Sequence, residues 1–67
     1  MKIERNGVGA FLLHANEREM VLINNAINEI CHGIRLEDFE IRVGVPIAEA
    51  QSVLKIVSRA LTESELH

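Results

Sequence analysis

The sequence has no tryptophan, no tyrosine, one proline and a single cysteine, Cys31. One cysteine excludes an internal disulfide, and a lone thiol is typical of a reducing compartment, so we expect a cytoplasmic protein. No apolar run approaches the roughly 18 residues of a membrane span. The first five residues are not followed by the apolar core of a secretory signal, so we expect neither a membrane protein nor a secreted one.

Positive charge is also scarce. Seven Lys and Arg residues oppose ten Asp and Glu residues, which gives a formal net charge of -3 and an isoelectric point near 5.5. A field of this sign repels the phosphate backbone of nucleic acids and anionic membranes. We therefore expect no membrane partner, regard nucleic acid as an unfavourable partner, and consider a basic protein easier to bind.

The chain is short for an independent fold. Its 67 residues allow a single domain, 1–67, and such a domain buries only about 60% of its unfolded surface. Chains of this size usually need a disulfide, a metal or a second copy to supplement the core. The composition, 48% hydrophobic and 25% charged, is typical of a folded protein. Because the sequence offers no disulfide and no convincing metal or cofactor site, we expect a homo-oligomer, most simply a dimer.

A long amphipathic helix over 16–33 is the clearest element. Asn16 can cap its first turn, Glu19 stands where a capping box needs it, and Gly33 suits a left-handed residue after the last turn. The residues that share one apolar arc at helical spacing are Met20, Ile23, Ala26, Ile27, Ile30, Cys31 and Ile34. We expect this arc to be the core face.

Residues 1–14 are expected to form a β-hairpin. Asn6-Gly7 is a favoured pair for a type I′ turn, which would place Arg5 opposite Val8 and Ile3 opposite Ala10. One face of the hairpin would then pack on the central helix.

The other face of this hairpin carries Phe11 and Leu13 opposite Lys2 and Glu4 in the same register. Two strands alone are barely stable in water, so this face needs a further layer. That layer could come from the same chain or from a neighbouring molecule, and we favour the neighbour.

Residues 36–45 fit two patterns. Phe39, Ile41 and Val43 alternate with polar residues as in a strand, yet Leu36, Phe39 and Val43 also stand at helical spacing. The glycine turn at 44–46 ends the segment and a second amphipathic stretch follows at once, which favours a short helix.

The final helix is expected from about Pro46 to Leu61. Pro46 is tolerated in a first turn and Glu49 complements the helix dipole there. Its broad apolar stripe comprises Ile47, Ala50, Val53, Leu54, Val57, Ala60 and Leu61. We thus expect a helical hairpin over 36–62 and a frayed tail over 63–67.

The candidate interaction residues are Phe11, Leu13, Asn24, Asn28, Glu37, Asp38 and Glu40. Asn24 and Asn28, one turn apart beside the apolar arc, can bond either the segment after Gly33 or a partner, and we favour the same chain because most side-chain hydrogen bonds go to backbone or water. The acidic cluster of Glu37, Asp38 and Glu40 is either solvated surface or the docking site of a basic partner.

The helices around Gly44 also have the hydrophobic spacing of a helix-turn-helix. However, Glu40 stands near the crossing, where a small residue is usual. In a DNA complex Glu49 would enter the major groove ahead of Lys55 and Arg59. A nucleic-acid-associated regulator is therefore kept as the alternative function.

Zinc or thiol chemistry would have to come from Cys31, His32 and His14. Adjacent Cys31 and His32 point in different directions on a helix and cannot both hold one ion without distortion. We interpret Cys31 as a core residue, His32 as a cation at the negative end of the helix dipole, and His14 as a possible partner of Glu17. No nucleophile has a recognisable base, so we expect no enzyme activity.

The run LINNAINEICHG at 22–33, followed by Asp38-Phe39-Glu40 and by RVGV at 42–45, resembles a group of short bacterial proteins of unassigned function. The resemblance covers most of the chain. It implies an N-terminal hairpin joined to an asparagine-rich helix and a glycine-valine turn before a last helix. That group usually has a serine where Pro46 stands. Such a serine would cap the final helix, and this arrangement supports a helix over 36–43 before it. The resemblance implies no catalytic or binding residues.

Together these patterns predict an α+β fold, in which a two-stranded N-terminal hairpin packs on a long central amphipathic helix. A short helix, a glycine turn and a C-terminal amphipathic helix follow. We expect a non-catalytic cytoplasmic protein that acts through protein-protein contact and self-associates through its hairpin. An inhibitor or immunity-like role against a basic partner is one concrete form of this hypothesis.

Overall fold

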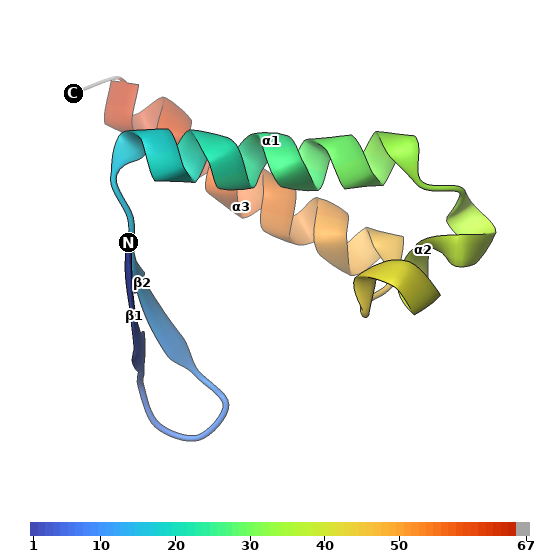
Figure 1. The fold of residues 1–67 in the computed structure, drawn as a ribbon. Coiled ribbons are helices and arrows are strands. Elements are labelled where there is room, and N and C mark those ends of the chain that lie inside the picture. Colours follow the sequence, from blue (N-terminus) through green and yellow to red (C-terminus); the bar gives the residue numbers. More distant parts are fainter. Residues whose placement is uncertain (66–67) are drawn as a thin grey trace.

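The computed structural model describes the backbone of residues 1–65 and the side chains of residues 1–63. Strands β1 (Lys2–Arg5) and β2 (Phe11–His14) form an antiparallel hairpin, and helices α1 (Glu17–Gly33), α2 (Leu36–Val43) and α3 (Ile47–Glu65) follow. α3 runs back alongside α1, α2 connects them at one end, and the hairpin projects from the other end (Figure 1). The predicted α+β fold class is confirmed.

The core lies where the three helices meet. Each helix contributes one buried residue: Cys31 from α1, Phe39 from α2 and Ala50 from α3. Phe39 is the largest of them and is only 1% exposed. The partly buried residues around them are Ile27, Ile30, Ile34, Val43, Val45 and Ile47. The burial of Cys31 confirms its interpretation as a core residue.

The apolar arc predicted for α1 faces α3 along most of its length. Ile23, Ile27 and Ile30 are partly buried, whereas Asn25 on the other side is exposed. Ala26 is exposed as well, which corrects its assignment to the core face. It lies at the margin of the arc, where a helix that packs on a single neighbour is left uncovered.

Hydrogen bonds fix both ends of α1. The Glu19 amide donates to Asn16 Oδ1 at 2.8 Å and the Asn16 amide donates to Glu19 Oε1 at 2.9 Å, so the predicted capping box is present. Gly33, by contrast, is the last helical residue and not a left-handed cap. Ile34 ends the helix in an extended conformation, and this lets its side chain reach the core.

The segment after α1 is helical, as the punctuation around Gly44 indicates. Gly44 adopts a φ of 97° and ends α2 in the left-handed conformation. Pro46 precedes α3, and its carbonyl accepts from the amides of Glu49 and Ala50. α3 continues to Glu65, beyond the expected end at Leu61, because no glycine or proline interrupts it. The last two residues of the predicted tail, 66–67, lie outside the described part of the chain.

The register of the hairpin differs from the prediction. The pairs are Lys2 with His14, Ile3 with Leu13, Glu4 with Leu12, and Arg5 with Phe11. The loop spans 6–10 and is closed by a 2.9 Å hydrogen bond from the Asn6 amide to the Ala10 carbonyl. A type I′ turn needs positive φ at Asn6, but the positive values in this loop are 80° at Gly7 and 76° at Gly9. The second glycine permits the wider loop, and that loop shifts the register.

The hairpin does not pack on α1, contrary to the prediction. Within residues 1–65, no strand Cα atom approaches a helix Cα atom three or more positions away to within 8 Å. The chain enters α1 through Asn16 in an extended conformation, which directs β2 away from the helix axis. The molecule is consequently L-shaped and flat, with extents of 38 × 31 × 16 Å (Figure 1). None of the helices within residues 1–65 has the length and apolarity that a membrane span requires.

We expect Phe39→Ala to lower the free energy of unfolding by about 3 kcal/mol, because it leaves a cavity between three helices. Ile41→Ala is the matched control on the same helix, since Ile41 is 87% exposed, and it should change the value by less than about 0.5 kcal/mol. Urea unfolding followed by circular dichroism measures both variants. Equal losses in the two would contradict the position of the core.

Candidate interaction surfaces

One face of the hairpin is apolar. Residues directly opposite in the two strands share a face, so Ile3 and Leu13 lie on the same side as Arg5 and Phe11. The Arg5 guanidinium lies 4.7 Å from the centroid of the Phe11 ring, within cation-π distance. The side chains of Ile3, Phe11 and Leu13 are exposed, and we call them the apolar hairpin face. Phe11 and Leu13 are therefore on a face with Ile3 and Arg5, not with Lys2 and Glu4 as the predicted register required.

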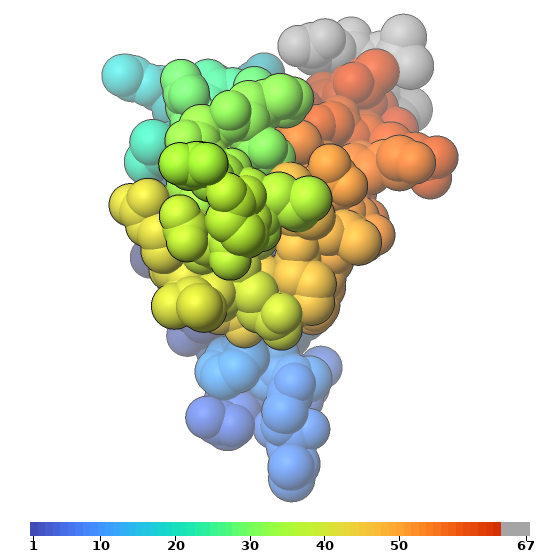
Figure 2. All heavy atoms as spheres, turned by 90° about the vertical axis from the view of Figure 1, so that its right-hand side faces the viewer, coloured from blue at the N-terminus to red at the C-terminus, as the bar shows by residue number. Residues whose placement is uncertain are grey.

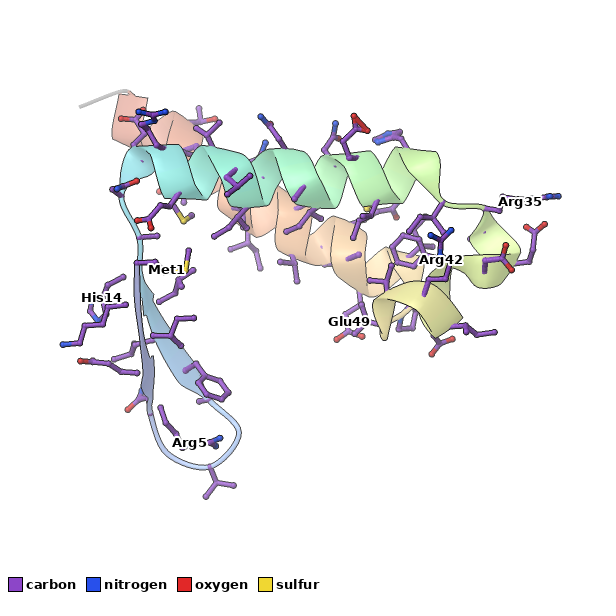
Figure 3. All side chains as sticks on the ribbon, in the orientation of Figure 1. Met1, Arg5, His14, Arg35, Arg42 and Glu49 are labelled. Carbon is purple, nitrogen blue, oxygen red and sulfur yellow. The ribbon has the colours of Figure 1, made fainter. Side chains whose placement is uncertain are left out.

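The opposite face of the hairpin is polar. Glu4 accepts from Lys2 Nζ at 2.9 Å and lies 3.3 Å from His14 Nε2, so its carboxylate bridges both side chains. His14 thus pairs across the strands with Glu4 and not with Glu17. Met1 and Arg5 lie on the side of the hairpin that faces the helices, whereas His14 points outward (Figure 3). The apolar hairpin face is accordingly the inner face of the L.

An ion pair ties the base of the hairpin to α1. The amino group of Met1 lies 2.8 Å from Glu19 Oε2, and the other oxygen of this carboxylate accepts from the Asn16 amide. The Met1 amino group, together with the Asn16 amide, lowers the pKa of Glu19 below the ordinary value of 4.5. One carboxylate thus both caps α1 and holds the first strand at the start of that helix.

A second exposed apolar surface lies on α3. Val53, Ile56 and Ala60 are exposed and share one side of this helix at i, i+3 and i+7, and we call them the α3 stripe. Val53 and Ala60 were predicted in the buried stripe, but α1 covers only part of so broad a surface. Ile56, 68% exposed, was missed by the sequence reasoning, although its spacing from Val53 and Ala60 was the available signal.

The molecule exposes more surface than a compact chain of its size. Its accessible surface is 5498 Å², whereas about 4250 Å² is expected for a folded monomer of 7.5 kDa. Its radius of gyration is 13.3 Å, against about 11 Å for a compact domain of this length. The surplus is roughly 1250 Å², and the hairpin and α3 both leave large hydrophobic side chains uncovered.

The two candidate asparagines have different surroundings. Asn24 Oδ1 accepts from the Ser58 hydroxyl at 2.7 Å, so it joins α1 to α3 within the chain. Its partner is therefore Ser58 of α3, within the chain, and not the segment after Gly33 as expected. The backbone carbonyl of Asn28 accepts from His32 Nδ1 at 2.8 Å, in the last turn of α1, while the Asn28 side chain is exposed.

The acidic candidates form the outer surface of α2. Glu37, Asp38 and Glu40 are exposed, and Glu37 pairs with Arg35 at 3.1 Å. Glu37 and Asp38 occupy the first turn, where the helix dipole favours negative charge. Sequence reasoning missed Ile41, an exposed apolar side chain beside Glu37 and Asp38 on the same surface, although it follows them at helical spacing.

The reactive side chains are not brought together. His14 lies just before α1 and His32 in its last turn, so the length of the helix, about 1.5 Å per residue, separates them, and Cys31 is buried in the core. Among the described side chains, those of residues 1–63, no group of three or more from His, Cys, Asp and Glu could hold a metal ion. The hollow lined by Glu17, Arg18, Val21 and Leu22 is an open depression on the outer side of α1.

The helix pair around Gly44 has the order of a helix-turn-helix, but its charges oppose DNA. Seen from the end of the molecule that carries α2, that helix lies over the start of α3 (Figure 2). Glu49 is exposed in the first turn of α3, and the acidic residues of α2 lie close by in sequence. Contacts with phosphate groups supply most of the affinity for DNA, and the negative charge of this surface would repel those groups.

In comparisons with known proteins, no family model, no curated protein and no solved structure matches this chain.

We expect the stability of the protein to fall on acidification, partly through Glu19. The pKa of this carboxyl is lowered in the folded state, so its contribution is complete above the unfolded value near 4.5 and is lost as pH falls through the folded value. Thermal unfolding between about pH 5 and about pH 3 should therefore be less pH-dependent in Glu19→Gln than in the unaltered protein. Glu29→Gln, an exposed glutamate in the middle of α1, is the control. An identical acid response in both variants would contradict the role of Glu19.

Proposed function

We propose that this protein has no catalytic activity of its own and acts through protein-protein contact, self-associating through the apolar hairpin face. The observation that supports this most strongly is a hairpin with three exposed hydrophobic side chains, whose strand Cα atoms stay more than 8 Å from those of the helices within residues 1–65. An isolated two-stranded hairpin is marginal in water. A neighbour on this face supplies the layer that the hairpin lacks.

The energetics favour burial of this face. Covering the exposed parts of Ile3, Phe11 and Leu13 stabilises by about 1 kcal/mol for each side chain, and a symmetric contact uses the face twice. The polar face, with its Lys2, Glu4 and His14 contacts, gains little from burial because charged groups are costly to remove from water. The apolar hairpin face is thus the contact surface and the polar face stays in solvent.

The acidic surface of α2 provides a separate contact for a basic partner. Three exposed carboxylates attract a basic protein at long range, and Ile41 among them offers an apolar contact at short range. An inhibitor or immunity-like protein that blocks a basic partner is the concrete form of this proposal. A lone Cys31 thiol is typical of a reducing compartment, and we place the protein in the cytoplasm.

We expect Leu13→Lys to convert a dimer into a monomer and Leu12→Lys to leave it dimeric. Both leucines lie on β2 and both are 47% exposed, but Leu13 belongs to the apolar hairpin face and Leu12 to the polar face. The new charge would be buried only in Leu13→Lys, which should weaken association by about tenfold or more. Sedimentation equilibrium of both variants measures this, and equal behaviour would contradict the assignment of the contact face.

The acidic surface is tested by reversing one charge. Glu40→Lys should reduce the recovery of a basic partner from extracts of the native host, and the loss should be greater at low salt because the attraction is electrostatic. Glu29→Lys makes the same change of charge on an exposed position of α1 and should have no such effect. Recovery that is indifferent to Glu40→Lys would count against the inhibitor hypothesis.

A further inference from the structure

The α3 stripe and the apolar hairpin face border the same open side of the molecule. Glu49, Val53, Ile56 and Ala60 follow one another at helical spacing and so share one side of α3. Glu49 projects from α3 toward the side on which the hairpin lies (Figure 3). The stripe that follows it therefore faces the inner corner of the L.

The hairpin does not cover this stripe in its own chain, within the residues that the structure describes. Asn16 and the Met1–Glu19 ion pair hold the base of the hairpin at the start of α1, and in the described residues no strand backbone comes near a helix. The two apolar surfaces of one chain thus stay apart, although each could bury the other. An uncovered sheet face and an uncovered helix face form a stable layer when they pack together.

The exposed area and the charges of the two apolar surfaces are suited to contact with a second copy of the chain. The surplus surface of roughly 1250 Å² exceeds the ~800 Å² that each partner buries in a standard interface. Arg5 lies on the apolar hairpin face near the loop, and Glu49 stands at the start of the α3 stripe. A hairpin laid on the stripe of a second copy brings opposite charges together.

We propose that two copies exchange their hairpins: the apolar hairpin face of each docks on the α3 stripe of the other, and Arg5 pairs with Glu49 across the contact. This inference rests on the proposed self-association and specifies its geometry. The exchange is reciprocal, so a two-fold axis closes it as a dimer. It covers the hairpin and the stripe at once, whereas a contact between two hairpins would leave Val53 and Ile56 exposed.

A charge-reversal cycle tests this geometry. Arg5→Glu and Glu49→Arg should each weaken the dimer by about tenfold, because each sets like charges against each other across the contact. The double variant restores opposite charges and should recover affinity to within about threefold of the unaltered protein. Lys2→Glu combined with Glu49→Arg is the control, because Lys2 lies on the polar face of the hairpin, and it should give no recovery. Sedimentation equilibrium measures each dissociation constant, and circular dichroism confirms that each variant is folded.

The outcomes separate the two proposals. A dimer whose affinity is not rescued in the double variant, or is rescued equally by Lys2→Glu, overturns the exchange but not self-association. An unaltered protein that stays monomeric overturns both. As a second readout, a Leu13→Cys chain mixed with an Ile56→Cys chain should form the mixed disulfide in preference to either homodimer. Predominant linkage between two Leu13→Cys chains would show that hairpin packs on hairpin and would contradict the exchange.

Discussion

A two-stranded sheet cannot bury its own face, and this constraint governs the whole molecule. The helices bury part of their apolar surfaces around Phe39, whereas the hairpin leaves Ile3, Phe11 and Leu13 exposed and its strand backbone away from the helices in the described part of the chain. Folding of the single chain therefore leaves apolar surface in water, and burying this surface would add stability. The accessible surface, larger than that of a compact monomer, reflects this exposure, and contact with a second molecule is the simplest way to reduce it.

The contacts at the start of α1 determine where the exposed hairpin lies. Asn16 and Glu19 close the capping box, and the same Glu19 carboxylate binds the Met1 amino group. These contacts set the direction in which the hairpin leaves the helices, so a local cap has a long-range effect on shape. At the other end, the left-handed Gly44 turns α2 back onto the core. The result is a helical part whose α3 stripe borders the same open side as the apolar hairpin face.

Local signals predicted the helices well and the hairpin poorly. Capping at Asn16, the apolar spacing of α1 and the glycine at 44 each depend on nearby residues, so the sequence indicated them directly. The hairpin register depended on whether Asn6 or Gly9 adopts positive φ, and the favoured Asn-Gly pair was misleading because a second glycine was available. The exposure of Val53 and Ala60 could not be predicted, because it depends on how α1 and α3 cross and on where the hairpin is directed. Ile56 and Ile41 were missed because they lie outside the predicted core stripes and are exposed.

We propose that another copy of the chain covers the apolar hairpin face. Sedimentation equilibrium of the unaltered protein over a range of concentrations tests this claim most directly. We predict a mass of about twice the 7.5 kDa of the chain, falling toward the monomer on dilution. A mass that stays at that of a single chain at every concentration would contradict the account.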